Sequence, residues 1–320
     1  MYLPKSKKGV SQLKKIIAIV LAAVMLFSLT GCSLLVKKVS VECTCPGCLA
    51  AKNGQDQSSD VEYKKLEASS KSGVDCSKLP TDKASILKLY TDVANATKAA
   101  KEQTVDIIAE GAKIQVGAII VDETGKELAP SLMPTANKLI DSFSPKPEEY
   151  TCDFSGGTDK NGNKTTTTED IRTPKNTLPA WEQDYMCQLE DAQVKSAEAE
   201  ELSDGYWKVT IILEDAPCEM TDPKVTPDTP HAHCMGVVQA GDLLTDFGGN
   251  GTIYYANLNY KDSAIVAVID PVSGYLVQLH TSLFIYGEAK MDVKLMSIGK
   301  VTASLEKTTF INTYNWSKIG

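Results

Sequence analysis

The stretch that decides the fold reads YLVQLHTSLFIY at residues 275–286 and AKMDVKLMS at residues 289–297. Apolar and polar side chains alternate along much of both segments, and a period of two gives a β-strand one apolar face. The apolar positions are Val277, Leu279, Leu283, Ile285, Met291, Val293 and Leu295. The polar positions opposite them are Gln278, His280, Ser282, Asp292 and Lys294. We therefore expect two strands that share an apolar face.

Comparable segments surround this stretch and extend it into a meander. Strands are expected at Ile253–Tyr260, Ala264–Asp270, Tyr275–Tyr286, Ala289–Ser297 and Val301–Trp316. Turns are expected at Lys261-Asp262, Pro271–Gly274, Gly287 and Ile298-Gly299. Because short turns join consecutive strands, each strand should be the antiparallel neighbour of the next. The predicted fold class is α+β, a long curved antiparallel β-meander covered by one or two helices.

The expected cover is an amphipathic helix at Asp82–Glu102, with Thr81 or Asp82 as the N-cap. Its apolar residues recur at helical spacing, at Ile86, Leu89, Tyr90, Val93 and Ala96 or Thr97. Shorter helices are expected at Pro134–Phe143 and Val237–Phe247. Even two long helices are too few to cover such a sheet completely, which leaves open whether a curved half-barrel with an apolar hollow lies beneath them.

The rest of the chain predicts shorter elements and loops. The β-branched stretch Thr104–Val121, interrupted by Gly111 and Gly117, predicts one or two strands with a bend, closed by a turn at Asp122–Gly125. Val194–Leu202 and Tyr206–Glu214 predict a hairpin around Ser203-Asp204-Gly205. The polar stretch Phe154–Pro179 predicts a surface loop, and Pro217–Pro230 a proline-rich link.

The N-terminus carries an export signal. Five lysines without an acidic residue, at positions 5, 7, 8, 14 and 15, precede the apolar run Ile16–Leu29. This run is shorter than the roughly 20 apolar residues of a spanning helix. Leu29-Thr30-Gly31-Cys32 follows and resembles the lipobox of bacterial lipoproteins. The resemblance implies that residues 1–31 are a signal peptide and that Cys32 carries the diacylglyceryl and palmitate-type acyl lipid. An uncleaved signal anchor is the alternative.

The sequence then divides into a stalk and a folded part. Residues 32–80 predict a flexible, cysteine-containing stalk, because residues from Ser33 to Pro80 are rich in Lys, Ser, Gln and Asp. Residues 81–320 predict a single α+β domain. This layout resembles uncharacterised cell-envelope lipoproteins of Gram-positive bacteria and, more loosely, half-barrel lipid carriers of the LolA and LppX type. The resemblance implies an extracytoplasmic protein that is lipid-anchored to the cell membrane.

Charge limits the partners. The chain has 33 Lys and Arg against 41 Asp and Glu, a net charge of -8, which becomes more negative when residues 1–31 are removed. An acidic protein repels phosphate backbones and anionic headgroups, so we expect no nucleic-acid partner. Membrane contact should therefore occur through the lipid anchor alone.

Eight cysteines remain besides Cys32, and an even number in an exported chain favours disulfides. Nearest-neighbour pairing predicts Cys152–Cys187 and Cys218–Cys234. The other four lie in the stalk, at Cys43, Cys45, Cys48 and Cys76. Disulfides between them are the favoured interpretation. A redox motif at Cys45-Pro-Gly-Cys48 and a zinc site formed by all four are the alternatives.

Two clusters have the residue types of metal ligands. His231, His233 and Cys234 could donate to zinc or copper, although a surface loop beside a disulfide is the favoured interpretation. A second set resembles part of a calcium loop and comprises Asp159, Asn161, Asn163 and Asp170. Lys164 stands where a calcium loop has glycine, so a polar turn is favoured there.

No catalytic residue is predicted, because the chain contains no nucleophile elbow, zinc-protease motif, phosphate loop or dinucleotide fingerprint. His280 is interpreted as a sheet-surface residue. The favoured function is a non-catalytic binding module, for an apolar or lipid-like ligand or an envelope component. The alternatives are a structural or adhesive envelope protein that binds through Phe154–Pro179, and a metal-binding or enzymatic surface protein.

Overall fold

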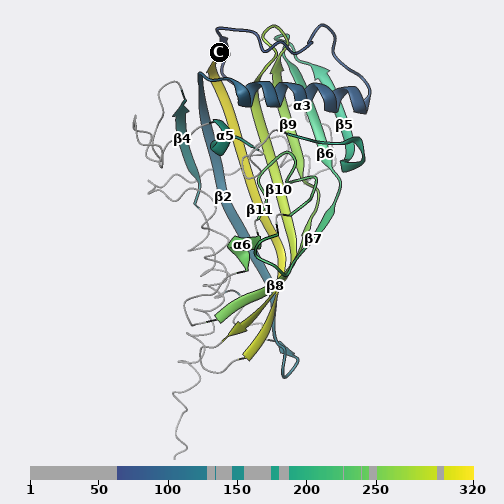
Figure 1. Ribbon diagram of the computed structural model, residues 1–320, viewed down its shortest axis with the longest axis vertical. Helices are drawn as coiled ribbons and strands as arrows, with labels where there is room; N and C mark the ends of the chain where they lie inside the picture. The colour runs from purple at the N-terminus through teal and green to yellow at the C-terminus, as the bar shows by residue number, and fades with distance from the viewer. Residues whose placement is uncertain are drawn as a thin grey trace, which may run out of the picture.

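A computed structural model describes residues 63–127, 134, 146–154, 174–179, 187–225, 227–238, 240–244, 251–293 and 299–320. These residues form one sheet of 11 strands with a long helix across it (Figure 1). The strands are β1 (Glu67–Ala68), β2 (Gln103–Val121), β3 (Lys126–Glu127), β4 (Glu148–Asp153), β5 (Val194–Glu201), β6 (Trp207–Leu213), β7 (Ala216–Met220), β8 (Gly251–Tyr260), β9 (Ala264–Asp270), β10 (Tyr275–Val293) and β11 (Gly299–Ile319). The helical elements are α3 (Lys83–Ala99), α5 (Pro174–Thr177), η2 (Asp191–Gln193) and α6 (Ala240–Leu243).

The sheet is antiparallel except at one short contact, and it confirms the predicted fold class. Its main path runs β3-β2-β11-β10-β9-β6-β5. Outside this path, β4 pairs with β2, β7 with β8, β8 with β10, and β1 pairs in parallel with the end of β11. The three longest strands, β2, β10 and β11, lie side by side and carry the curvature of the sheet (Figure 1).

Strand β10 corrects the prediction of two strands separated at Gly287. It runs unbroken through this glycine, with a register shift between Ile285 and Gly287. Gly287 has φ 145°, and a Cβ atom there would lie 2.1 Å from the carbonyl oxygen of Asn257. A glycine is therefore required for the close approach of β8, and it permits a bulge where a turn was predicted.

Strands β8 and β9 are not paired neighbours, which is a second correction. Both pair with the same edge of β10: β8 along residues 285–293 and β9 along residues 275–282. The chain therefore does not reverse at Lys261-Asp262. β8 and β9 run in the same direction along β10, and the two residues form a break between them. Asp262 absorbs the change of direction with φ 52°, a left-handed conformation that Asp tolerates better than most residues.

Helix α3 confirms the predicted cover. The Asp82 side chain accepts a hydrogen bond from the Ser85 amide at 3.0 Å, and the helix ends at Ala100, whose amide donates to Ala96 and Thr97. The predicted apolar positions Ile86, Leu89, Tyr90 and Val93 are buried. The helix crosses one face of the sheet near the end where β11 finishes (Figure 1).

Several elements arise where loops or links were predicted. β4 was not predicted, and β7 lies in the proline-rich link, because Ala216, Cys218 and Met220 alternate as buried residues on a short strand that pairs only with β8. α5 lies inside the predicted surface loop, and the neighbouring Leu178 is only 2% exposed. The predicted short helix at Val237–Phe247 is limited to α6 within the described residues.

The predicted hairpin is confirmed as β5 and β6, with Gly205 at φ 84° in its turn. The stretch Thr104–Val121 forms one strand, β2, whose register shifts absorb the predicted bend. The predicted helix at Pro134–Phe143 lies outside the described residues, apart from Pro134.

Residues 63–80, expected in the stalk, pack against the domain. Leu66 is buried, β1 extends the sheet beside β11, and the Tyr63 hydroxyl donates to Asp204 at 2.6 Å. The signal peptide, Cys32 and the stalk up to residue 62 lie outside the described residues. Among the helices that the structure describes, none combines the length and hydrophobicity needed to cross a membrane.

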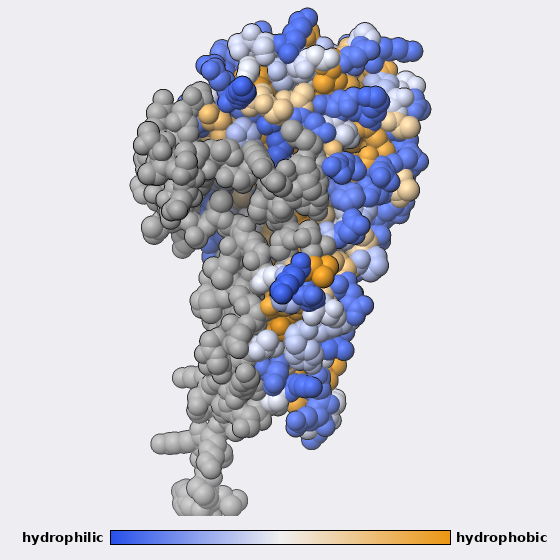
Figure 2. Space-filling model, in the orientation of Figure 1, coloured by the Kyte–Doolittle hydropathy of each residue, from blue (hydrophilic) through white to orange (hydrophobic). Residues whose placement is uncertain are grey.

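The polar residues Gln278, His280 and Ser282 in the first half of β10 are buried too, which corrects the interpretation of His280 as a surface residue. His280 is 7% exposed, and its Nδ1 lies 2.9 Å from the Thr313 hydroxyl. Two positions away, the Gln278 amide donates to Asn315 Oδ1 at 2.7 Å. Cross-strand pairing with β11 thus satisfies polar groups and makes their burial possible. Figure 2 shows the molecule from the side that α3 crosses. On the coloured part of this surface, hydrophobic residues lie in small groups among hydrophilic ones.

Candidate functional site

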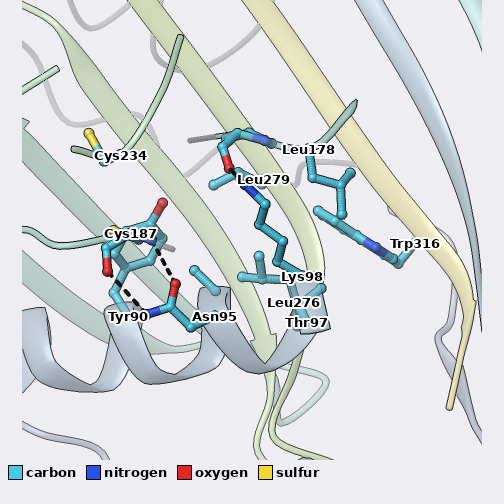
Figure 3. Close-up of a pocket in the computed structure, with 12 residues that line it drawn as sticks. Tyr90, Asn95, Thr97, Lys98, Leu178, Cys187, Cys234, Leu276, Leu279 and Trp316 are labelled. Atoms are coloured by element: carbon cyan, nitrogen blue, oxygen red, sulfur yellow. Dashed lines mark hydrogen bonds between the residues drawn. The ribbon is translucent and has the colours of Figure 1, made fainter. Parts of the chain in front are cut away.

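A pocket lies between the C-terminal half of α3 and the sheet (Figure 3). Six separate parts of the chain line it: α3, the segment after α5, the two cysteine-bearing segments, the start of β10 and the end of β11. The lining residues are Tyr90, Ala94, Asn95, Thr97, Lys98, Leu178, Pro179, Cys187, Cys234, Leu276, Leu279 and Trp316. Its volume is about 20 Å³. That volume holds about one water molecule, so the space beneath this part of the helix is filled by side chains.

Lys98 is the charged group of the pocket. Its side chain leaves the last turn of α3 and runs between apolar neighbours, including Leu178 and Leu279 (Figure 3). The residue is 8% exposed, and its ammonium donates a hydrogen bond to the Pro179 carbonyl oxygen at 3.1 Å. A buried ammonium is costly unless it is hydrogen-bonded, so this contact ties the segment after α5 to the helix.

Two α3 side chains attach the helix to its surroundings through backbone groups. Asn95 accepts from the Cys187 amide at 2.7 Å and donates to the Cys187 carbonyl at 3.1 Å, as a neighbouring strand would (Figure 3). The Thr97 hydroxyl accepts from the Leu276 amide at 3.0 Å, where the β9–β10 ladder shifts register. The helix therefore satisfies a backbone group that the bulge leaves out of the ladder.

Gln103 completes this end of the pocket. Its side-chain amide donates to the carbonyl oxygens of Thr97 and Ala100 at 2.9 and 2.7 Å, which caps the end of the helix. Its side-chain oxygen accepts from the Trp316 indole at 2.9 Å. Gln103 is 1% exposed. Both N–H groups and the oxygen of this buried amide have partners, so it fixes the helix end against β11.

Three acidic groups face the pocket in their protonated forms. Burial raises the pKa of the Cys187 thiol to about 11, against opposing effects that include the nearby Lys98 charge. Burial, with Cys187 nearby, raises the pKa of Cys234 well above its ordinary value. Burial also holds the pKa of Tyr90 well above its usual range. At neutral pH these thiols are poor nucleophiles, because the thiolate is the reactive form.

The structure separates the predicted ligands His231, His233 and Cys234. The His231 ring is buried and stacks on Tyr260 with centroids 4.9 Å apart. The Cys234 thiol donates to the Pro230 carbonyl at 3.3 Å and lines the pocket. Within the described ranges, no group of three or more His, Cys, Asp or Glu side chains is placed to hold a metal ion.

His233 forms a His–carboxylate pair of the kind found in catalytic machinery. Its Nε2 lies 2.9 Å from Asp228 and its Nδ1 lies 2.9 Å from the Gln193 amide. A general base needs one ring nitrogen directed at a nucleophile, whereas both nitrogens here have partners within the fold. The His233–Gln193 contact anchors the 227–238 segment to η2, and a catalytic role does not follow from the His233–Asp228 pair.

The other predicted site residues are dispersed or lie beyond the described ranges. Cys152 is buried on β4 opposite Val105, Cys218 lies on β7 opposite Leu258, and Cys76 is half-exposed. The predicted pairing partners of Cys187 and Cys234 are thus on strands of the sheet, whereas these two cysteines share the pocket. The positions outside the described residues are Cys43, Cys45, Cys48, Asp159, Asn161, Asn163 and Asp170.

Sequence reasoning missed Lys98 and Asn95 as pocket residues. A signal for Lys98 exists, since it follows Tyr90 and Ala94 at intervals of four residues and therefore continues the buried side of the helix. Comparison of the chain with protein-family models, curated proteins and solved structures finds no match. The resemblance to half-barrel lipid carriers consequently rests on layout alone.

Proposed function

We propose that this chain is a membrane-tethered extracytoplasmic lipoprotein whose α+β domain is a non-catalytic binding module. The tether rests on the sequence Leu29-Thr30-Gly31-Cys32. The binding module rests on one observation, the buried Lys98 ammonium in a largely apolar pocket. Lysine is among the residues that are least often buried, so its position among apolar side chains supports a role beyond packing.

The chemistry of the pocket favours an amphiphile with an acidic head and an apolar tail. A carboxylate is a stronger acceptor for an ammonium than the Pro179 carbonyl, because both partners are then charged. The tail would lie against Leu178, Leu276 and Leu279. At about 20 Å³ the pocket is far below the several hundred Å³ of a typical ligand site, so binding requires Leu178 and Pro179 to move away.

Native mass spectrometry with dodecanoic acid and dodecanol tests the binding module. We expect an adduct of the acid that is about tenfold weaker in Lys98→Met, because the methionine keeps the length of the side chain and removes the charge. Dodecanol should bind both proteins equally. Lys88→Met, on the exposed side of α3, is the matched control. Equal binding of the acid to Lys98→Met and wild type would contradict the proposed site.

Peptide mapping of protein from the host envelope tests the tether independently. We expect Cys32 as the first residue, carrying lipid on its sulfur and nitrogen. Recovery of an unmodified Cys32 inside an intact leader would overturn the proposed location.

A structural or adhesive envelope protein is the second candidate, and the filled space beneath α3 favours it. A packed interior needs no ligand, and recognition would then occur on the surface. Deleting residues 155–173 within the predicted binding loop should abolish binding of the domain to isolated host envelopes and leave its melting temperature nearly unchanged. Unaltered binding after the deletion would contradict this candidate.

A further inference from the structure

The two cysteines that share the pocket lie on segments in direct backbone contact. The Gln188 amide donates to the His233 carbonyl oxygen at 2.9 Å, and these residues directly follow Cys187 and directly precede Cys234. Both cysteines line the pocket beside Tyr90 (Figure 3). The chain between them contains β5, β6 and β7, so their proximity is a tertiary contact.

We propose that Cys187 and Cys234 form a disulfide bond that joins the 227–238 segment to the segment before η2. Both cysteines are free thiols in the structure, and this pairing is an alternative to the two nearest-neighbour pairs predicted from sequence. Its occurrence in the cell rests on the proposed extracytoplasmic location, whereas the choice of partners rests on the geometry alone.

Hydrogen bonds hold the backbone of Cys187 in place, whereas the side chain of Cys234 has to rotate before the bond can form. Asn95 fixes the backbone of Cys187 through both its amide and its carbonyl. Cys234 lies in a turn, and its thiol is directed at the Pro230 carbonyl at 3.3 Å. Bond formation requires the Cys234 sulfur to leave this carbonyl and face Cys187. The two thiols are near enough to interact, because Cys187 contributes to the raised pKa of Cys234.

The oxidant is an external disulfide, such as a thiol–disulfide exchange protein or oxidised glutathione. One cysteine thiolate attacks the oxidant, releases one thiolate from it and forms a mixed disulfide. The second cysteine thiolate then displaces the remaining oxidant thiolate and closes the Cys187–Cys234 bond. In total, the two thiols lose two protons and two electrons, and the oxidant disulfide is reduced to two thiols.

Burial sets the order of events. Cys187 and Cys234 are 5% and 1% exposed, and their protonated thiols react slowly in the folded domain. The bond should therefore form while this region is still unfolded. Once α3 covers it, the same burial excludes reductants.

The decisive experiment is peptide mapping of the full chain. Protein purified from the host envelope is reduced, refolded in a glutathione redox buffer, alkylated and digested without reductant. We expect a linked peptide pair that carries Cys187 and Cys234. Recovery of both residues as alkylated thiols, or a dominant link from either one to another cysteine, would overturn the proposal. If only unrefolded envelope material shows both alkylated, the proposed location is wrong and the pairing stands.

Thermal unfolding supplies a second measurement. Protein that is reduced while unfolded and refolded in reductant should melt about 10 °C below the oxidised wild type, the effect of opening a long cross-linked loop in a domain of this size. Cys187→Ala and Cys234→Ala should each abolish this sensitivity. Cys218→Ala is the matched control and should retain it, since Cys218 is buried on β7 outside the pocket. Wild-type sensitivity in Cys187→Ala would contradict the pairing.

Discussion

Two parts of the chain cover the sheet, and they treat buried polar groups differently. At the end of α3, the hydroxyl of Thr97 and the amide of Gln103 bond to the helix, to β10 and to β11. In the 227–238 segment, His231 is fully buried, yet neither ring nitrogen has a hydrogen-bond partner among the described residues. The helix therefore stabilises the sheet with satisfied polar contacts, whereas the turn introduces a group whose protonation the fold opposes.

The largest expected effect concerns the end of α3, where the buried polar groups are hydrogen-bonded. Gln103→Ala should lower the free energy of unfolding by about 4 kcal/mol, because it leaves two carbonyl oxygens and the Trp316 indole without their buried partner. Urea unfolding followed by tryptophan fluorescence measures the change. Gln115→Ala is the matched control on the exposed side of β2. It should lower the free energy of unfolding by less than roughly 1 kcal/mol, as is usual for substitutions at the surface. Similar losses of stability in both variants would contradict a larger contribution from the buried hydrogen bonds of Gln103.

The next effect concerns the 227–238 segment, where the buried ring of His231 has no hydrogen-bond partner among the described residues. Burial lowers the pKa of His231 to about 4 from its usual 6.5, with Lys195 acting in the same direction and Asp215 opposing it. The unfolded chain takes up a proton near pH 6.5, whereas the folded chain does so only near pH 4. Stability should therefore fall as pH decreases through this window, by about 3 kcal/mol in total.

Urea unfolding at a series of pH values measures this loss, and His231→Leu isolates it. The variant removes the titrating ring, so its stability should change about 3 kcal/mol less than that of the wild type between the same two pH values. Parallel pH profiles for the two proteins would mean that another group carries the acid sensitivity.

The smallest effect tests the contact between helix and bulge. Thr97→Val keeps the shape of the side chain and removes the hydroxyl that accepts from the Leu276 amide, so we expect a loss of about 1–2 kcal/mol. Hydrogen exchange at the Leu276 amide should accelerate in step with the local destabilisation. Thr97→Ser restores the hydroxyl and should recover most of the protection. An unchanged exchange rate in Thr97→Val would show that the Thr97 hydroxyl does not protect the Leu276 amide.

Periodicity was sufficient to predict the elements but not their pairing. The helical spacing of Ile86, Tyr90 and Val93 and the alternation in β10 identify the cover and the sheet correctly. By contrast, a glycine such as Gly287 is compatible with a turn or with a bulge, and only the close approach of β8 selects the bulge. Likewise, Lys261-Asp262 can reverse a chain or interrupt a strand, and the choice depends on which edge of β10 is available.

The candidate site was less accessible to sequence reasoning, because its walls come from distant segments. Leu178 lies in a polar stretch that predicts a surface loop, and it is buried only because α3 and Lys98 lie where they do. Nearest-neighbour pairing of Cys218 with Cys234 assumes that distance along the chain indicates distance in space. The 227–238 segment breaks this assumption when it contacts residues 187–193.

The parallel contact of β1 with the last residues of β11 also fixes where the start of the described chain meets the sheet. Residues 63–68 reach the sheet at the end that α3 crosses, and the turn between β2 and β3 lies at the other end (Figure 1). A strand as long as β11, with its 21 residues, extends over roughly 70 Å. A tether that enters through residues 63–68 would therefore join the domain at the α3 end, with residues 122–125 at the far end of the long strands (Figure 1).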